Sequence, residues 1–408
     1  MKIGLVFPGF AADATDWCIP ALTNLVRALA ARPAVEVHVF TLRYPPRQAT
    51  YHLHGATVHA FGGAAIGGHR LWGVSLGLLW AAFLVAVRRE HQRAPFRILH
   101  GFWATESGYL AARAGRHLGI PTLVHLAGGE LIADRAIGYG NQGLGLPRLL
   151  VARSLHLATR ITVPSSYIQA QLQARYPQHA AKAVAWPLGV DIQRFTPRPA
   201  PEDETADDGV ADQEPGSAIP QSKIQNPKSK IRLIHVASLL PVKAQDRLLA
   251  GLAVARAQAP QPAIGLTIVG QGPQDAALRA LVARLGLGAA VTFRGAVDHA
   301  ALPALYRAHD AFVLTSRHEA QCLAVLEAAA CGLPWIGPPV GALADLARDG
   351  PPSGWPVAAT PAALGQALVA ATAPAIRAER GRQARARVEQ AYALERQVDR
   401  LLALYGPG

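Results

Sequence analysis

The chain has few cysteines, and this scarcity excludes one class of protein. Among its 408 residues only Cys18, Cys322 and Cys331 are cysteines, too few for a disulfide framework. His318 precedes Cys322 by four residues, but no further ligand completes the spacing of a metal site. We therefore expect a protein of the reducing cytosol that holds no metal.

Two familiar nucleotide-binding signatures are also missing. No G-x-G-x-x-G follows the first strand-like segment of either half, which disfavours a nicotinamide-dependent dehydrogenase. No G-x-x-x-x-G-K-[ST] occurs, which excludes a P-loop nucleotidase. The run Met1–Phe7 is too short for a secretory signal and opens a strand pattern instead. We therefore expect a cytoplasmic protein outside these two nucleotide-binding classes.

What the chain does have is length, hydrophobic residues and positive charge. Its 408 residues exceed what one hydrophobic core usually serves, so we expect two domains. Half of the residues are hydrophobic and 6% are aromatic, which suits an α/β protein with Leu- and Ala-rich helices. The net charge of +13 is concentrated in residues 1–198, where 20 Lys and Arg accompany 8 Asp and Glu. Such a basic surface either serves solubility alone or favours anionic lipid headgroups and phosphorylated substrates as partners. The sequence shows no pattern typical of nucleic-acid binding, so we do not expect nucleic acid as a partner.

Strand-like and helix-like segments alternate along both halves of the chain. Short apolar runs bounded by turn residues predict strands, and longer periodic segments predict helices. The predicted strands are Lys2–Phe7, Val35–Leu42, Thr57–Phe61, Arg97–Gly101, Thr122–Leu126, Ile161–Val163, Arg232–Ala237, Gly265–Val269, Val291–Phe293, Ala311–Leu314 and Pro334–Gly337. Helices separate most of them, and the end of the chain, Ala375–Leu404, is strongly helical. This order predicts parallel, doubly wound sheets.

Residues 199–230 interrupt the alternation. The segment is acidic, then basic, and has almost no apolar periodicity, which is typical of a disordered linker. We therefore divide the chain into an N-terminal domain (1–198), the linker, a C-terminal domain (231–385) and a closing helix (386–408). Two open sheets joined in this way form a cleft, and ligands of such sheets bind beyond the carboxyl ends of the strands.

One stretch is apolar enough to suggest a membrane. Leu71–Val87 has 17 residues without a charge, at the lower limit of roughly 17–25 residues for a spanning helix. The stretch lies between two strand-like segments of one domain, so we interpret it as a buried or interfacial helix. Trp72 and Trp80, with Arg88 and Arg89 just beyond, are typical of a helix in a membrane interface.

The strongest signal of chemistry is Glu319–Glu327, with the sequence EAQCLAVLE. A predicted strand leads into this loop and a helix begins near Leu323, so the first amides of that helix would form an anion site for a phosphate. Glu319 would lie beside the site, and Glu327 could accept hydrogen bonds from the hydroxyls of a ribose. Spacing alone leaves the assignment open, because two solvated glutamates on a helix are common.

This stretch resembles the glutamate–seven residues–glutamate motif of the retaining glycosyltransferases of family 4, which have the GT-B fold of two Rossmann-like domains. Further segments resemble the family in the same order. They are Pro187–Phe195 (PLGVDIQRF), Leu239–Leu248 (LLPVKAQDRL), Ile268–Val297 and the C-terminal YALERQVDRLLALY. The resemblance implies an acceptor-binding N-terminal domain, a donor-binding C-terminal domain and a last helix that packs back on the N-terminal domain.

The resemblance also implies roles for single residues. Lys243 matches the lysine that contacts the donor diphosphate, where its ammonium would offset charge that grows on the leaving phosphate. Glu319 matches the glutamate near the donor sugar, and Glu327 matches the one that holds the ribose. Further implied donor contacts are Gly9, Gly270, Leu323 and Ala324, and Gly9 fits an ordinary turn glycine equally well.

Three positions depart from the family pattern. Ser238 stands where the family usually has an arginine, and Cys322 stands where it often has a glycine, both within the implied donor site. Ala127 stands where a histidine is expected. His125, two residues earlier on the same strand face, either substitutes for that histidine or is a packed core residue. Glu130 then becomes the better acceptor-side candidate.

Together these features predict a retaining glycosyltransferase. It would move a hexosyl-type sugar from a uridine or guanosine diphosphate sugar to an acceptor hydroxyl. Lys243 and the helix amides would stabilise the leaving diphosphate, so neither a metal nor another cofactor is required. The basic N-terminal half and the apolar helix favour a lipid or cell-envelope glycan acceptor at the inner face of an anionic membrane. Two alternatives stay open: a non-catalytic nucleotide-sugar binding protein, and a GT-B epimerase or phosphorylase.

Overall fold

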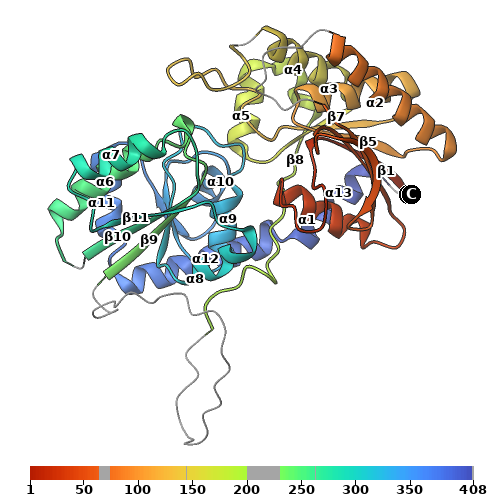
Figure 1. Ribbon diagram of the computed structural model, residues 1–408. Coiled ribbons are helices and arrows are strands. Elements are labelled where there is room, and N and C mark those ends of the chain that lie inside the picture. Colours follow the sequence, from red (N-terminus) through yellow and green to blue (C-terminus); the bar gives the residue numbers. More distant parts are fainter. Residues whose placement is uncertain (64–73, 144, 200–229, 262, 407–408) are drawn as a thin grey trace, which may run out of the picture.

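The computed structural model describes residues 1–63, 74–143, 145–199, 230–261 and 263–406, which form two α/β units (Figure 1). The strands of the N-terminal unit form one sheet in the order β3-β4-β2-β1-β5-β6-β7-β8. They are β1 (Lys2–Gly9), β2 (Glu36–Tyr44), β3 (Gln48–Leu53), β4 (Ala56–Phe61), β5 (Ile98–Phe102), β6 (Thr122–His125), β7 (Arg160–Val163) and β8 (Ala183–Ala185). All neighbours run parallel except β3 and β4, so the predicted parallel sheet is confirmed here.

Helices cover both faces of this sheet. Ile3 and Leu5 of β1 pack in the cluster that includes α1, while Val6 packs in the cluster under α2 and α3. This alternation follows from the two-residue period of a strand. The helices are α1 (Pro20–Ala30), α2 (Val74–Arg93), α3 (Glu106–Leu118), α4 (Gly145–Leu157) and α5 (Ser166–Arg175), followed by the 3₁₀ helix η1 (Pro177–Lys182).

The C-terminal unit repeats the architecture with a smaller parallel sheet, ordered β11-β10-β9-β12-β13-β14. Its strands are β9 (Lys230–Val236), β10 (Ala263–Val269), β11 (Val291–Gly295), β12 (Ala311–Val313), β13 (Trp335–Gly337) and β14 (Gly354–Pro356). Its helices are α6 (Gln245–Gln258), α7 (Asp275–Arg284), α8 (Leu302–Arg307), α9 (Leu323–Ala330), α10 (Ala342–Arg348), α11 (Pro361–Ala370) and α12 (Pro374–Ala391), with the short 3₁₀ helices η3 (Pro241–Lys243) and η4 (His299–Ala301).

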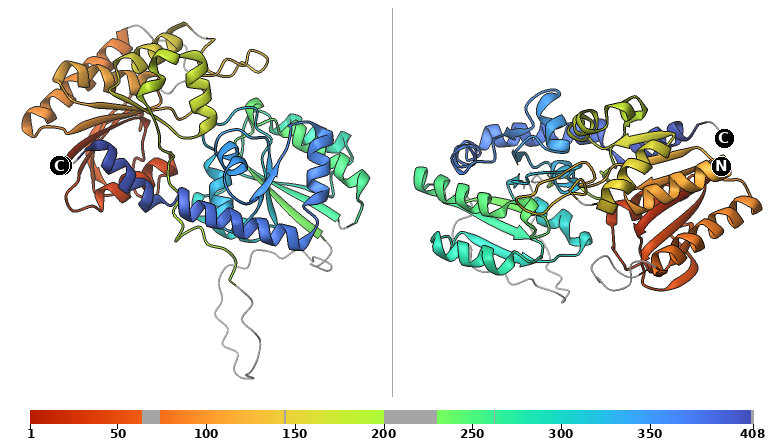
Figure 2. Two further views of the ribbon diagram at one scale, coloured as in Figure 1. Left: turned by 180° about the vertical axis from the view of Figure 1, so that it is seen from behind. Right: turned by 90° about the horizontal axis from the view of Figure 1, so that it is seen from above.

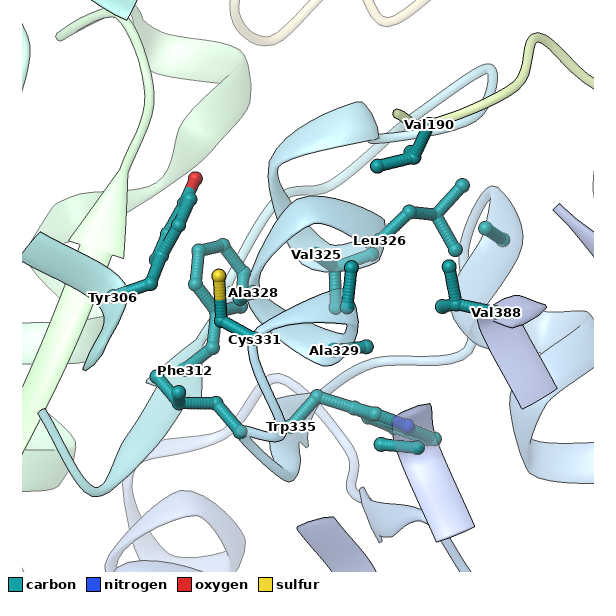
Figure 3. Close-up of a cluster of buried hydrophobic side chains, with 14 of the residues drawn as sticks. Val190, Tyr306, Phe312, Val325, Leu326, Ala328, Ala329, Cys331, Trp335 and Val388 are labelled. Atoms are coloured by element: carbon teal, nitrogen blue, oxygen red, sulfur yellow. The ribbon is translucent and has the colours of Figure 1, made fainter. Parts of the chain in front are cut away.

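Helix α9 is held in place by the core of the C-terminal unit (Figure 3). Val325, Leu326 and Ala329 of α9 are completely buried. Phe312 of β12 and Trp335 of β13 pack in the same cluster. Because its body is fixed on this sheet, the N-terminus of α9 has a defined place beyond the ends of the strands.

The chain end crosses back from the C-terminal to the N-terminal unit (Figure 2). The helical stretch predicted over Ala375–Leu404 is two helices, α12 and α13 (Leu394–Tyr405), separated at Tyr392. The Val190 amide donates to the Tyr392 carbonyl at 2.8 Å, and the Leu394 amide donates to the Val190 carbonyl at 2.9 Å. A Cβ on Gly189 would lie 2.4 Å from the Leu394 Cα, so only glycine allows this approach. The PLGVD segment therefore fits into the break between the two helices.

Helix α13 packs on the N-terminal unit. Val398, Leu401 and Tyr405 are buried in the cluster that also contains residues of β1 and α1. The indole of Trp186 donates to the Gln397 carbonyl at 2.9 Å. The last helix therefore packs on the N-terminal unit, and it begins at Leu394, because the chain up to Ala391 belongs to α12.

Several predicted features differ or lie outside the described residues. Strand β3 was not predicted; it pairs antiparallel with β4 across His54 and Gly55, both with positive φ, as in a tight hairpin. The linker at 200–229 lies outside the described residues, as do the first three residues of the apolar stretch 71–87. The rest of that stretch lies in α2, with Phe83 buried and Leu78 and Val85 exposed. In the part of the chain that is described, no helix has the length and apolarity needed to cross a membrane.

Candidate functional site

A cavity of ≈ 290 Å³ lies between the two units, at the carboxyl ends of strands from both sheets. The N-terminal unit lines it with Ile19, Ala21, Leu22, Phe102, Trp103, His125, Ala127, Pro164 and Leu188. The C-terminal unit lines it with Val236, Ala237, Ser238, Lys243, Leu314 and Glu319–Ala324. Among these described lining residues Lys243 is the only cationic side chain, since His125 is neutral at pH 7. An anionic ligand in the cavity would therefore meet one ammonium group.

Lys243 and Glu319 form an ion pair at this cavity. Lys243 ends η3, just after β9, and its Nζ lies 2.6 Å from Oε1 of Glu319. The same carboxylate oxygen accepts a hydrogen bond of 2.6 Å from the Ser316 hydroxyl. Burial is the largest single effect and disfavours the ammonium, but the charge and hydrogen bond of Glu319, together with the neighbouring Cys322 and Tyr139, raise the pKa of Lys243 overall. Lys243 is therefore positively charged at neutral pH.

The N-terminus of α9 opens on the same cavity. Leu323 and Ala324 of its first turn line the space, and no side-chain hydrogen bond caps the helix. Cys322, just before the helix, has a φ of +68°, in the left-handed region that favours glycine. Burial raises the pKa of the Cys322 thiol, so the thiol stays protonated. The amide groups required by the predicted phosphate site are thus in place, although a phosphate contact stays a prediction.

Glu327 lies further along α9, and its carboxylate already has partners. Oε1 lies 2.7 Å from Nε2 of His299, and Oε2 accepts a hydrogen bond of 3.2 Å from the Tyr306 hydroxyl. The ring of His299 in turn lies against that of Trp17 in a tilted arrangement, and Trp17 comes from the loop between β1 and α1 of the other unit. Glu327 does not line the cavity. Its predicted contact with a ribose would require these partners to be exchanged or shared.

His125 lines the cavity but is packed as a core residue. Its Nδ1 lies 3.1 Å from the Thr162 hydroxyl, and its ring contacts those of Phe102 and Trp186. Burial lowers the pKa of His125 to about 3. Its Nε2 has no hydrogen-bond partner among the residues that the structure describes. The packed-core interpretation agrees with these contacts, and a role in catalysis stays a prediction.

Glu130 is not among the residues that line the cavity, and its carboxylate binds backbone amides. Its carboxylate accepts hydrogen bonds from the amides of Ala104, Ala127 and Gly128, at 3.2, 3.0 and 2.6 Å. Burial raises the pKa of Glu130, against the opposing effect of these hydrogen bonds. Its position favours a role in shaping the loop that carries Ala127, and its predicted acceptor contact would need the loop to open.

The remaining predicted donor residues differ in their position. Ser238 is exposed and lines the cavity close to the end of β9. Gly270 has a φ of +136°, and a Cβ there would lie 1.9 Å from the Ala237 carbonyl oxygen. Only glycine therefore fits against the backbone that precedes Ser238. Gly9 ends β1 beside Tyr44 and, like Gly270, is not among the lining residues.

Comparison with known families decides the identity of the chain. The family described as Glycosyltransferase Family 4 matches residues 21–194, and the one described as Glycosyl transferases group 1 matches residues 219–385. A D-inositol 3-phosphate glycosyltransferase from Geodermatophilus obscurus is 30% identical over 340 residues, which cover 79% of this chain and 70% of that protein. The chain belongs to the group 1 glycosyltransferases of family 4. It spans 63% and 60% of the length of two further relatives with the same name.

Solved structures confirm the GT-B fold of this family 4 chain. Sucrose-phosphate synthase from Thermosynechococcus elongatus superposes with a TM-score of 0.72 and 21% identity, covering 99% of this chain and 98% of that one. HepE from Anabaena, solved in complex with UDP and glucose, superposes with a TM-score of 0.68 and 16% identity over 99% of each chain. At these identities the likeness concerns the fold.

Two contacts between the units, at or beside this family 4 site, were not predicted from the sequence. The side chain of Gln321 makes hydrogen bonds with both backbone groups of Leu188. Its Nε2 donates to the carbonyl at 2.7 Å, and its Oε1 accepts from the amide at 2.9 Å. Tyr139 stacks on His318 of the other unit with ring centroids 6.1 Å apart. Gln321 lies within the EAQCLAVLE motif, so the motif could have indicated a role for it. No sequence pattern indicates a role for Tyr139.

Proposed function

We propose that the chain is a retaining glycosyltransferase that moves a hexosyl-type sugar from a nucleoside-diphosphate sugar to an acceptor hydroxyl. The observation that carries this proposal is the meeting of Lys243, Glu319 and the first amides of α9 at one cavity between the two units. An ammonium and a helix N-terminus together favour the negative oxygens of a diphosphate. The UDP bound in HepE supports a uridine diphosphate donor, with the guanosine counterpart as the second choice.

In this proposal Lys243 acts chiefly when the bond to the leaving diphosphate breaks. Negative charge then grows on the phosphate oxygen, and the ammonium with the α9 amides offsets it. Glu319 holds Lys243 in position before the donor arrives, through the 2.6 Å contact between Nζ and Oε1. These groups supply the charge stabilisation themselves, so we propose that the reaction needs no metal. Closure of the two units would keep water from the donor.

We also propose that the acceptor is anionic and lies at a membrane surface, as a lipid or a cell-envelope glycan. A groove between α2 and α3 is lined by Arg88, Arg113, Arg116 and His117 together with apolar side chains. Leu78 and Val85 of α2 are about two thirds exposed, at 67% and 65%. Basic and apolar groups side by side suit an anionic lipid surface. The name of the Geodermatophilus relative, D-inositol 3-phosphate glycosyltransferase, likewise supports a phosphorylated acceptor.

A non-catalytic nucleotide-sugar binding protein is the second candidate. It is favoured by the single cation among the described lining residues, because Ser238 replaces the arginine expected beside Lys243. The amide-bound carboxylate of Glu130 favours it as well. Such a protein would bind the donor without releasing free nucleoside diphosphate.

Calorimetry with UDP, GDP and their hexose conjugates tests the donor site. We expect wild-type protein to bind one conjugate with a dissociation constant better than millimolar, and Lys243→Ala to bind it at least tenfold more weakly. Arg279→Ala, which removes an exposed cation of α7, is the matched control and should bind like wild type. Absence of binding by wild type would refute the donor assignment.

Turnover then separates the two candidates. Release of free nucleoside diphosphate in the presence of inositol phosphate or anionic vesicles identifies a transferase and its acceptor class. Binding without release over hours identifies the non-catalytic alternative. The configuration of the product's new linkage, read by NMR, tests retention, and an isomerised donor sugar would indicate an epimerase instead.

A further inference from the structure

We propose that the N-terminal unit binds one zinc ion through His38, His59 and Glu90, at a site separate from the cavity. His38 lies on β2, His59 on β4 and Glu90 near the end of α2. One ligand atom of each lies within 4.8 Å of the others. None of the three lines the cavity between the units. Imidazole nitrogen with carboxylate oxygen is a ligand set typical of zinc.

The sheet brings the two histidines together. β2 and β4 are parallel neighbours, in which His38 pairs with Thr57 and Phe40 pairs with His59. Paired residues of neighbouring strands point to the same face of a sheet, and residues two apart on one strand do so too. Both imidazoles therefore lie on the face that α2 covers, which is where Glu90 arrives.

The separation of the two nitrogens is close to what zinc requires. Nδ1 of His38 lies 3.1 Å from Nε2 of His59. Two nitrogens bound to one tetrahedral zinc at ~2.0–2.1 Å lie about 3.3 Å apart. A zinc ion bound to both nitrogens would lie about 1.2 Å off the line that joins them, so the two rings would have to turn as well as separate by a few tenths of an ångström. The carboxylate of Glu90 has to approach further, by a change of side-chain rotamer.

The outer contacts of the histidines are those expected of metal ligands. Nε2 of His38 lies 2.8 Å from Oε1 of Glu36, so the carboxylate fixes the ring and leaves Nδ1 free to bind a metal. Nδ1 of His59 lies 3.5 Å from the Thr50 hydroxyl, on the side away from His38.

Two cations now neutralise Glu90 and would have to be accommodated. Arg93 donates to its Oε1 at 2.6 Å, and Nζ of Lys2 lies 3.6 Å from its Oε2. The Arg93 side chain is 57% exposed and can turn into solvent when zinc replaces it. Lys2 is buried and also donates to the Glu90 carbonyl at 2.9 Å, so it would remain beside the site. With zinc bound, α2 would be joined directly to β2 and β4.

Zinc calorimetry on tag-free, chelator-treated protein tests the proposal. We expect one zinc per chain, and the visible absorption bands of a tetrahedral site when Co²⁺ is used as the probe. Glu36→Gln alters an exposed side chain that contacts a ligand and not the metal. It should lower the zinc affinity about 10–100-fold, the usual effect of losing such a contact. His59→Gln and Glu90→Gln should weaken it further, each checked for folding by circular dichroism.

The matched control is His52→Gln, which removes an exposed histidine from the neighbouring strand β3. We expect its zinc affinity to equal that of wild type. The proposal is overturned if wild type binds no stoichiometric zinc. It is equally overturned if folded Glu36→Gln, His59→Gln and Glu90→Gln all retain wild-type affinity, because the ion then binds elsewhere.

Discussion

Replacing Lys243 by Met removes the ammonium from the cavity while it keeps an unbranched side chain. The carboxylate of Glu319 then retains only the Ser316 hydroxyl at 2.6 Å as a partner for Oε1. The pair is partly buried, with 21% of the Lys243 side chain and 9% of the Glu319 side chain exposed. Exposed pairs contribute ~0–1 kcal/mol, and breaking fully buried ones costs ~3–5 kcal/mol. We expect Lys243→Met to lower the free energy of unfolding by about 2 kcal/mol.

The second substitution separates stability from catalysis. Adding Glu319→Gln removes the uncompensated charge, so we expect the double variant to regain about half of the lost stability. In the proposed reaction the leaving diphosphate would still lack its cation, so activity should not return. Loss of one group that stabilises transition-state charge lowers kcat by about 10²–10³. Urea unfolding measures the first quantity, and release of free nucleoside diphosphate at saturating donor measures the second.

Two results would refute this reasoning. A kcat of Lys243→Met within tenfold of wild type would mean that the ammonium does not act on the leaving group. Recovery of activity in the double variant would mean that Lys243 serves only to neutralise Glu319. Recovery of stability without activity is the outcome that the contact geometry predicts.

Three further predictions concern single positions. Cys322→Gly should stabilise the protein by about 0.5–1 kcal/mol in urea unfolding, because relief of the left-handed φ exceeds the extra entropy of glycine. Gly189→Ala should destabilise it by about 1–3 kcal/mol, since the new Cβ would lie 2.4 Å from the Leu394 Cα; an unchanged midpoint would contradict this. His125 has a pKa of about 3 in the folded protein, so it binds its proton more readily when the chain is unfolded. The free energy of unfolding should therefore fall by about 1.4 kcal/mol for each pH unit below pH 6.5. His125→Gln should show a correspondingly smaller fall between pH 6.5 and 4.

Much of the fold and part of the candidate site could be predicted because they depend on local pattern. Alternating apolar runs and helical periods indicate the two parallel sheets, and the segments around Lys243 and Glu319 follow strand ends directly. Carboxyl ends of parallel strands meet at one edge, so residues placed there converge. Lys243, Glu319 and the start of α9 do lie at one cavity, as their order along the chain predicts.

What the sequence by itself determined is therefore the order of elements, the GT-B arrangement and the strand ends that carry the candidate donor site. The tertiary structure alone decided which side chains already have hydrogen-bond partners. Glu327 contacts His299 and Tyr306, and Glu130 accepts hydrogen bonds from backbone amides. It also placed His38 and His59 3.1 Å apart. Periodicity tells which face a residue occupies, but hydrogen-bond partners depend on how distant elements pack, and no local pattern encodes that packing.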